Sequence, residues 1–488
     1  MRVRAGILVC LVVVGLVVFA AIEPRFDHPF PSMIDDWSAI AKAPEQLREV
    51  LRLGNPEEQR YRPGFIAWNA LQWHTLGAPD NFLGPQFWGV LRVAVLVLGV
   101  TLLAVLLTES GRSRIRGRDP RWLLVLGVPL AVITPPSLSI DLARYGPQEQ
   151  IMVGCMSLGA VLLVRSVDAF LNTAPPMPTT IAAAIGGIAL WAFGVLQKET
   201  SACVLLLAPF LWPTLRNERE RWAQLGRPRR AAVGLVATGI LLPFVPIVAR
   251  TIQLALADDR VYEEAAAAKG FVERFSDQFG RAGEVLHSQL PMFLLAAAVV
   301  LLAARTFRVG ADWLSTGLLV VALAFLLFAA EAGVVASRYY LPPIALGALA
   351  LARSAVSLGS GVVVATGVIL IAGGTWQAWD SNGWVEWWLD GERGHETLVR
   401  EAAARAAGGC EVGVIGLNVE LVEALPILMP LADEPPRDCA PGERYVVVID
   451  EGGPGTVTPP DHPVLSACAP EPTPAWSSNI AKILRCTT

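Results

Sequence analysis

The sequence predicts an all-α polytopic membrane protein with about eleven transmembrane helices and a small C-terminal α/β domain outside the cytoplasm. Four observations lead to this fold class. Of the 488 residues, 53% are hydrophobic and only 17% are charged, whereas soluble domains carry about 25% charged residues. The apolar residues form long runs, arginines gather in two connections between runs, and four cysteines fall in a polar tail.

The apolar runs are the candidate spans. Several approach the ~20 residues that a helix needs to cross a bilayer, and the shorter ones need flanking residues to complete them. The first run could be a signal peptide, because Ala20 and Ala21 end it with small residues, but we interpret it as an uncleaved anchor. The runs lie at 6–22, 87–108, 122–138, 150–170, 180–196, 201–215, 231–255, 290–304, 313–330, 339–352 and 360–376.

Arginine placement predicts the orientation. The connections 109–121 and 216–230 are rich in arginine, and short positively charged loops stay in the cytoplasm. Counting the spans as above puts both connections on one side, together with Arg305, Arg308 and Arg353. The N-terminus is therefore expected in the cytoplasm and the C-terminus outside it, in a multi-pass plasma membrane protein. The opposite side holds 23–86, 139–149, 197–200, 256–289, 331–338 and the tail after 376.

Cysteines support the same orientation. Three lie in apolar runs, and four lie in the tail: Cys410, Cys439, Cys468 and Cys486. Four cysteines in a polar segment suggest two disulfides in an oxidising compartment, with three possible pairings. A zinc site is the alternative, and it ranks below disulfides because no CxxC pair is present.

The chain divides into two predicted domains. Residues 1–376 form the transmembrane domain, including the long external loop 23–86, and residues 377–488 form the external domain. In the tail, a helical pattern at 395–407 and strand patterns at Val412–Ile415 and Tyr445–Ile449 are separated by Gly and Pro clusters. These patterns are typical of a small α/β domain.

Two polar motifs in the first external loop are candidates for chemistry. Asp35 and Asp36 can act as a general base or bind a divalent cation, although such a pair also suits a helix cap or a loop turn. Arg62, with Arg60 close by, offers a guanidinium fork that suits phosphate oxygens. Interfacial anchoring of the adjacent apolar stretch is the alternative for this motif.

Further motifs lie at the other predicted external turns. Lys198 and Glu199 divide an apolar stretch that is too long for one span, so they lie at or inside the membrane boundary. A charge at the bilayer centre costs about 2.5–3.5 kcal/mol, and such groups face a polar cavity or pair with each other. Arg338 can hold a phosphate, with Tyr339 and Tyr340 as interfacial partners. At the second external turn, Arg144 and Glu149 can instead snorkel to the interface.

In order and spacing, these motifs resemble the GT-C superfamily of membrane glycosyltransferases, which use polyprenyl-phosphate-linked sugars. The superfamily's acidic pair, Arg-Pro, Lys-Glu and Arg-Tyr motifs match Asp35-Asp36, Arg62-Pro63, Lys198-Glu199 and Arg338-Tyr339. The resemblance extends from the first span to about residue 353, and the tail lies outside it.

The resemblance implies an inverting transfer of a hexosyl or pentosyl group to a lipid, glycan or protein acceptor of the cell envelope. Asp35 or Asp36 would deprotonate the acceptor hydroxyl, and Arg62, Lys198 and Arg338 would stabilise the departing lipid phosphate. A divalent cation, Mg or Mn, is an open requirement, because the superfamily contains both kinds of enzyme. Supporting roles fall to Arg60, Arg144, Glu149, Glu199, Tyr339 and Tyr340.

Other functions are weighed against this one. A polysaccharide polymerase or ligase would share the lipid-linked substrates, and a lipid-linked-sugar transporter or flippase would place its site near the membrane midplane. A scaffold that presents the tail to a partner is a further alternative. The net charge of −4 gives no basic field for nucleic acid, and no Walker loop or Ser–His–Asp signature is present. High Ala, Arg and Gly usage suits a bacterium, while the sugar and acceptor are not indicated.

Overall fold

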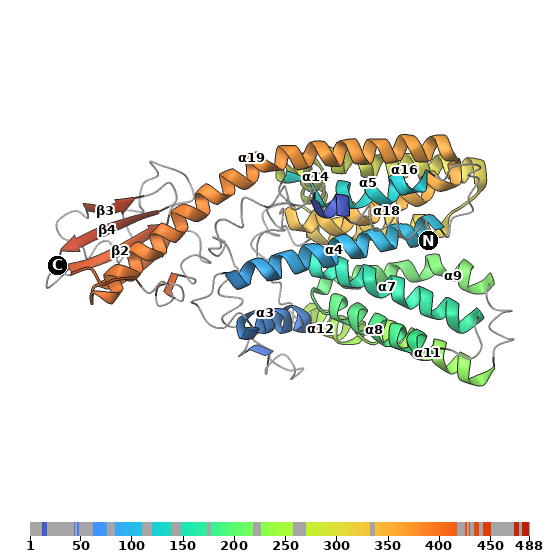
Figure 1. The fold of residues 1–488 in the computed structure, drawn as a ribbon, viewed down its shortest axis with the longest axis horizontal. Helices are drawn as coiled ribbons and strands as arrows, with labels where there is room; N and C mark the ends of the chain where they lie inside the picture. The colour runs from blue at the N-terminus through green and yellow to red at the C-terminus, as the bar shows by residue number, and fades with distance from the viewer. Residues whose placement is uncertain are drawn as a thin grey trace.

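The chain forms a bundle of apolar helices, and one long helix leads from the bundle to a small sheet (Figure 1). This is a computed structural model. It describes residues 12–16, 43, 46–47, 62–75, 83–109, 120–136, 138, 148–172, 177–217, 226–256, 270–331, 337–416, 425–426, 429, 434–438, 443–449, 473–477 and 481–487.

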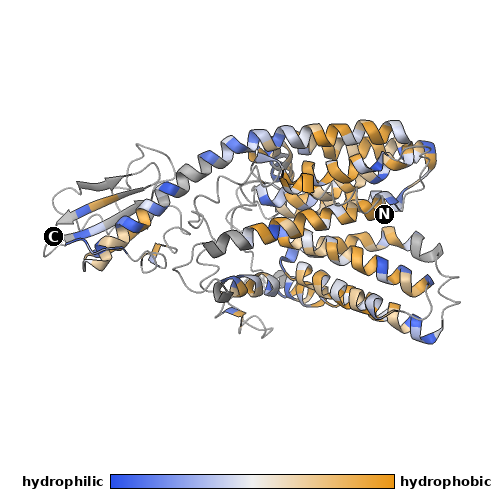
Figure 2. Ribbon diagram, in the orientation of Figure 1, coloured by the Kyte–Doolittle hydropathy of each residue, from blue (hydrophilic) through white to orange (hydrophobic). Residues whose placement is uncertain are grey.

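Eight helices in the described part of the chain are long and apolar enough to cross a membrane. They match eight of the predicted runs, which confirms the polytopic membrane fold. Two other runs, 122–138 and 201–215, form shorter apolar helices. The first run, 6–22, lies outside the described residues except for helical residues 12–16. Figure 2 shows that hydrophobic residues dominate the bundle and that the long helix turns hydrophilic beyond it.

The helices have the following bounds in chain order. They are α3 (Pro63–Thr75), α4 (Leu83–Glu109), α5 (Arg121–Ile133), α7 (Glu149–Asn172), α8 (Pro178–Val195), η2 (Glu199–Leu207), α9 (Ala208–Asn217), α11 (Arg227–Leu241), α12 (Phe244–Leu256), α14 (Phe271–Gly280), α15 (Ala282–Leu286), α16 (Leu290–Val309), α17 (Trp313–Glu331), η3 (Ser337–Tyr340), α18 (Leu341–Leu358) and α19 (Ser360–Ala407).

Glycines allow the principal helix pairs to approach closely. A Cβ added to Gly154 of α7 would lie 2.9 Å from the backbone of Leu96 on α4. A Cβ on Gly194 of α8 would lie 2.9 Å from the backbone nitrogen of Met156 on α7. In a bilayer, helices associate through van der Waals packing, and small residues bring their backbones together. Glycines therefore set the spacing of α4, α7 and α8.

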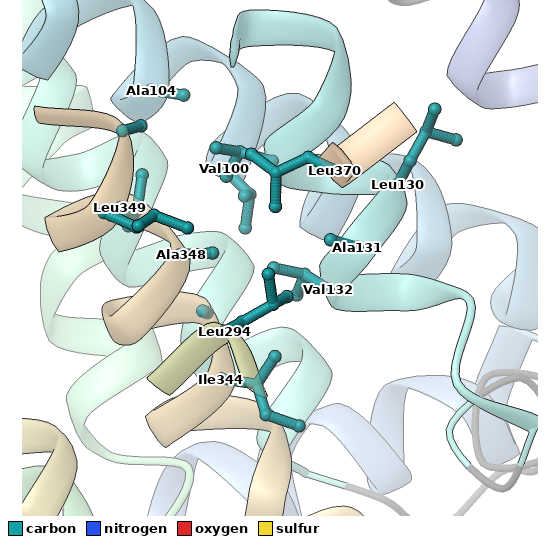
Figure 3. Close-up of a cluster of buried hydrophobic side chains, with 14 of the residues drawn as sticks. Val100, Ala104, Leu130, Ala131, Val132, Leu294, Ile344, Ala348, Leu349 and Leu370 are labelled. Carbon is teal, nitrogen blue, oxygen red and sulfur yellow. The ribbon is translucent and has the colours of Figure 1, made fainter. Parts of the chain in front are cut away.

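The hydrophobic core surrounds α18. Within its candidate span, 83% of α18 is buried, compared with 17% for the span that contains α16. Figure 3 shows side chains of α18 meeting those of α4, α5 and α16, among them Ile344, Ala348, Leu349, Val100, Ala104, Val132 and Leu294. α18 is thus the central helix, with Arg338 just before its start and Arg353 near its end. We call the two ends of the bundle the Arg338 end and the Arg353 end.

A buried ion cluster lies at the Arg353 end. Asp312, 5% exposed, lies 3.0 Å from Arg353 Nε and 3.5 Å from Arg305 Nε. Arg353 Nη1 also donates to the carbonyl of Leu107, in the last turn of α4, and Arg305 Nη1 donates to the carbonyl of Gly310, which follows α16. The sequence predicts Arg305 and Arg353 on one side of the membrane, and their shared partner confirms that they lie at the same end of the bundle.

The long helix α19 leaves the bundle at the Arg338 end, where the Trp384 ring stacks on His287 with 3.5 Å between centroids. Its candidate span ends at Trp384, and the helix then continues to Ala407 for roughly 35 Å more at 1.5 Å per residue. The predicted domain boundary at 376 therefore falls inside a continuous helix. The predicted helix at 395–407 is the last part of α19.

A four-stranded sheet is attached to the end of α19. Its order is β1-β2-β4-β3, with β1 (Glu411–Gly416) parallel to β2 (Glu443–Ile449), and with β4 (Ala481–Thr487) antiparallel to both β2 and β3 (Thr473–Ser477). β1 and β2 confirm the two predicted strands, whereas β3 and β4 were not predicted.

Hydrogen bonds and ion pairs tie the sheet region to the helix. The backbone nitrogen of Arg437 donates to the carbonyl of Ala404, and Glu401 pairs with both Arg405 and Arg437 at 2.6 Å. Cys410, directly before β1, is disulfide-bonded. Cys439, Cys468 and the side chain of Cys486 lie outside the described residues, so the pairing stays a prediction.

The glycine packing predicts a difference between two alanine substitutions. Gly154→Ala should destabilise the protein by about 1–3 kcal/mol, because the methyl group meets backbone that cannot rotate away. Gly186 on α8 has no atom within 4 Å of an added Cβ. Gly186→Ala should therefore be neutral or stabilise by up to about 1 kcal/mol through helix propensity. Thermal unfolding in detergent measures both, and an equal effect of the two substitutions would contradict the packing.

Candidate functional site

Polar residues from four separate segments meet at the Arg338 end of the bundle. The segments are the residue before α3, the start of α7, the turn between α8 and η2, and the short helix η3. They contribute Arg62, Gln148, Glu149, Gln197, Lys198, Glu199, Arg338 and Tyr339.

The turn after α8 places two charged residues side by side. α8 ends at Val195, and Lys198 has an extended backbone with φ −155° and ψ 140°. Ser201 closes the turn, because its hydroxyl donates to the carbonyl of Val195 at 2.7 Å and its backbone nitrogen donates to the carbonyl of Lys198. η2 then continues as a 3₁₀ helix for 9 residues, longer than the 3–4 residues usual for this conformation. The charges therefore lie where two apolar helices meet, as the sequence predicts.

Arg62 and Glu199 form a two-point ion pair. Arg62 Nε lies 2.6 Å from Glu199 Oε2, and Arg62 Nη2 lies 2.5 Å from Oε1. Nearby, the backbone nitrogen of Gly64 donates to the carbonyl of Leu196 at 2.9 Å. A Cβ on Gly64 would come within 2.8 Å of the same peptide group. Glycine at this position lets the start of α3 approach the turn, and the ion pair joins the two.

Lys198 is buried against a carboxylate and an aromatic ring. Its Nζ pairs with Glu149 Oε1, and each side chain is only 3% exposed. The same Nζ lies 3.8 Å from the centroid of the Tyr339 ring, a cation–π contact. Burial has the largest influence on the pKa of Lys198 and lowers it, whereas the Glu149 carboxylate raises it. The resulting pKa is about 8, below the ordinary value for lysine. Lys198 is therefore an ammonium at neutral pH that loses its proton at mildly alkaline pH.

Arg338 adds a third cationic side chain to the site. Arg338 lies 5.7 Å from the Tyr339 ring and acts electrostatically on both Glu149 and Lys198. Three cationic groups thus gather around two carboxylates among the described residues. Cations held in place in a poorly hydrated setting interact strongly with an anion.

Further buried polar residues lie on α3 and α4. Trp68 of α3 meets Trp88 of α4 edge to face, with 4.8 Å between the ring centroids. One turn farther along each helix, Gln72 and Arg92 are both 0% exposed. The sequence holds a signal for Arg92, because it is the single charged residue in the run 87–108.

The structure brings together six of the predicted site residues: Arg62, Glu149, Lys198, Glu199, Arg338 and Tyr339. Tyr340 instead lies in the hydrophobic core, 1% exposed. Asp35, Asp36, Arg60 and Arg144 lie outside the described residues. Gln148 and Gln197 were not predicted, since an uncharged amide next to a charged residue gives no signal of its own.

Metal-ligating residues do not cluster in the part of the chain that the structure describes. No group of three or more His, Cys, Asp or Glu side chains occurs there. The predicted acidic pair is not among these residues, so the expectation of a divalent cation stays a prediction.

Comparisons with known proteins show what the fold is similar to. No family model matches the sequence, and no curated protein is similar to it at a significant level. Among solved structures, ArnT from Cupriavidus metallidurans bound to undecaprenyl phosphate has a TM-score of 0.54 at 12% identity, covering 98% of this chain and 97% of that one. The same protein in its apo state gives 0.53 at 10% identity, with coverage of 99% and 98%. ArnT has the GT-C fold, and the fold implied by the resemblance is thereby confirmed.

The buried pair predicts a pH-dependent loss of stability in Glu149→Gln. Where Lys198 is charged, this variant leaves the ammonium without its carboxylate, which should cost about 3–5 kcal/mol. Glu149 raises the pKa of Lys198, which is about 8 in the wild-type protein, so in the variant the lysine loses its proton at a lower pH. The deficit relative to wild type should therefore shrink as the pH rises toward about 8 and be smallest above it.

The matched control is Glu109→Gln. Glu109 pairs with Arg165 at 2.5 Å, but these side chains are 41% and 55% exposed. Exposed pairs contribute about 0–1 kcal/mol, and no lysine titrates there, so this variant should lose little stability at any pH. Thermal unfolding at pH 6.5 and 9.0 measures both variants. A Glu149→Gln deficit that is the same at both pH values would show that Lys198 is not the titrating partner.

Proposed function

We propose that this protein is a membrane glycosyltransferase that transfers a sugar from a polyprenyl-phosphate donor to an acceptor of the cell envelope. The observation that carries the proposal is the convergence of Arg62, Lys198 and Arg338 from distant segments onto one end of the bundle. A cationic site at the membrane boundary suits a substrate whose phosphate sits at the surface and whose hydrocarbon tail lies in the bilayer. Undecaprenyl phosphate, bound to the ArnT of similar fold, has this chemistry.

The two cations around Tyr339 are the proposed phosphate ligands. Lys198 Nζ and Arg338 Cζ lie 3.8 and 5.7 Å from the centroid of that ring, and both side chains can bind phosphate oxygens. As the bond between the anomeric carbon and the phosphate oxygen breaks, its electron pair stays on the lipid phosphate. The cations stabilise the negative charge that develops there, an effect that grows where water is excluded. Arg62, held by Glu199, adds to the positive field.

The acceptor hydroxyl is the nucleophile in this reaction. Its oxygen forms the new bond to the anomeric carbon, and its proton passes to a base, for which we propose Asp35 or Asp36. Attack from the face opposite to the leaving phosphate inverts the anomeric centre. A divalent cation held by the acidic pair would polarise the phosphate, and omission of metal from the assay tests this requirement.

We further propose that the site faces away from the cytoplasm, with the N-terminus inside and the C-terminus outside. The arginine-rich connections and the tail cysteines support this orientation. A hexosyl or pentosyl group is the transferred unit, and a lipid, glycan or protein of a bacterial envelope is the acceptor.

The proposal predicts that substitutions of the phosphate ligands abolish transfer. The assay offers purified protein in nanodiscs a panel of radiolabelled polyprenyl-phosphate sugars, with total membrane lipid and polysaccharide as acceptors. Loss of one cation that stabilises the leaving charge should lower kcat by about 10²–10³-fold, in Lys198→Met and in Arg338→Met alike. Asp36→Asn should also abolish transfer without unfolding the protein.

Arg165→Met provides the control, because Arg165 is 55% exposed and pairs with Glu109 away from the site; it should keep wild-type activity. Donor binding without turnover would favour a flippase, and transfer of a whole chain would favour a polymerase or ligase. Neither binding nor turnover with any donor would refute the proposed function.

A further inference from the structure

We infer that Gln148 is a positioning residue that holds the Lys198 ammonium in place for the donor phosphate; this inference rests on the proposed function. With its amide oriented by its partners, Gln148 Nε2 donates to the carbonyl of Gln197 at 2.8 Å, and Gln148 Oε1 accepts from Arg62 Nη1 at 3.1 Å. One side chain therefore joins the segment before α3 to the turn after α8.

The amide is carried on a rigid support. Gln148 lies directly before α7, and its carbonyl accepts the first hydrogen bond of that helix from the backbone nitrogen of Met152 at 2.9 Å. α7 in turn packs backbone to backbone against α4 through Gly154 and against α8 through Gly194. The position of the amide is therefore set by the packed helices, whereas its two partners lie outside regular helix.

Two adjacent residues at the start of α7 bind two adjacent residues of the turn after α8. The Gln148 amide holds the carbonyl of Gln197, and the Glu149 carboxylate holds the ammonium of Lys198. An ion pair alone lets a long lysine side chain move around the carboxylate. The additional bond to the neighbouring carbonyl fixes the backbone from which the lysine extends, and this constrains where Nζ lies relative to Tyr339.

Gln148 also binds Arg62. Two nitrogens of this guanidinium bind Glu199 and the third binds Gln148. Arg62 is thus directed toward protein groups, which makes it a link between the segments in addition to a source of positive field. The amide binds the carbonyl of Gln197, which precedes Lys198, and it binds Arg62, which in turn holds the side chain of Glu199. It therefore constrains the Lys198–Glu199 dipeptide from both directions.

The test compares wild type with Gln148→Met, which keeps the length of the side chain and removes its hydrogen bonds. The probe is undecaprenyl phosphate, and its dissociation constant is measured for the full-length protein in nanodiscs. We expect Gln148→Met to weaken binding about tenfold at pH 7. The control Gln377→Met removes a more deeply buried amide of α19, which bonds Thr134 and Ser288, and it should leave binding unchanged.

A double-mutant cycle separates positioning from a general structural effect. If Gln148 acts through Lys198, then Lys198→Met should weaken binding much less in the Gln148→Met background than in wild type, whereas independent effects would add.

Should Lys198→Met fail to fold, a pH titration of binding takes the place of that variant. The ratio of dissociation constants for Gln148→Met and wild type should fall toward one above pH 8, as Lys198 loses its charge while Glu149, Glu199, Arg62 and Arg338 keep theirs.

The outcomes distinguish the two proposals. Three results would overturn the positioning role and leave the proposed function standing, provided that the wild-type protein binds undecaprenyl phosphate. The first is that Gln148→Met binds as tightly as wild type. The second is that the effects of Gln148→Met and Lys198→Met on binding are additive, and the third is that the ratio of dissociation constants, Gln148→Met to wild type, does not change with pH. No binding of undecaprenyl phosphate by the wild-type protein overturns the proposed function and, with it, the role of Gln148.

Discussion

The ion pair between Lys198 and Glu149 is the interaction on which the rest of the site depends. Each side chain is 3% exposed, so neither charge has water to replace its partner. Separating them would leave an uncompensated buried charge, which costs about 3–5 kcal/mol. The start of α7 and the turn after α8 are therefore held together, and the Arg62–Glu199 pair and the Gln148 amide assemble around that junction. The short helix η3, with Tyr339 against Lys198, completes it.

Both ends of the bundle contain buried charged groups that need partners, but the two ends provide those partners differently. At the Arg353 end, Asp312 faces two arginines, and each arginine also binds a carbonyl at the C-terminal end of a helix. A helix C-terminus carries about half a negative charge, so two of them and one carboxylate balance two guanidinium groups. At the Arg338 end, three cations face two carboxylates among the described residues, and Arg338 and Tyr339 are partly exposed. The cluster at the Arg353 end is suited to holding helices together, whereas the side chains at the Arg338 end include two that are partly exposed.

Local sequence predicts the spans and the charged motifs but not the contacts between them. An apolar run is a property of consecutive residues, so it can be recognised from the sequence alone. The runs therefore mark the helices, including η2, which is a 3₁₀ helix and not an α-helix. Glu149 and Lys198 lie 49 positions apart, and Arg62 and Glu199 lie 137 apart; nothing local connects such pairs. The predicted boundary at 376 follows the end of apolar character, whereas the backbone hydrogen bonds of α19 continue in polar sequence. β3 includes Pro474, and so it lacks the pattern by which strands are recognised.

Residues without chemistry of their own decide where the charged groups lie. Gln148 and Glu149 are at the first turn of α7, and Lys198 follows the last turn of α8. The spacing of these two helices is set by Gly194, whose missing side chain leaves the backbone of α7 in direct contact. A contact between backbones has no rotamers to adjust, so the distance between the two turns is fixed more closely than side-chain packing would fix it. Electrostatic stabilisation of a leaving group requires charges that are in place before the reaction begins. Glycines inside the membrane therefore supply the precision that a charged site at its boundary needs.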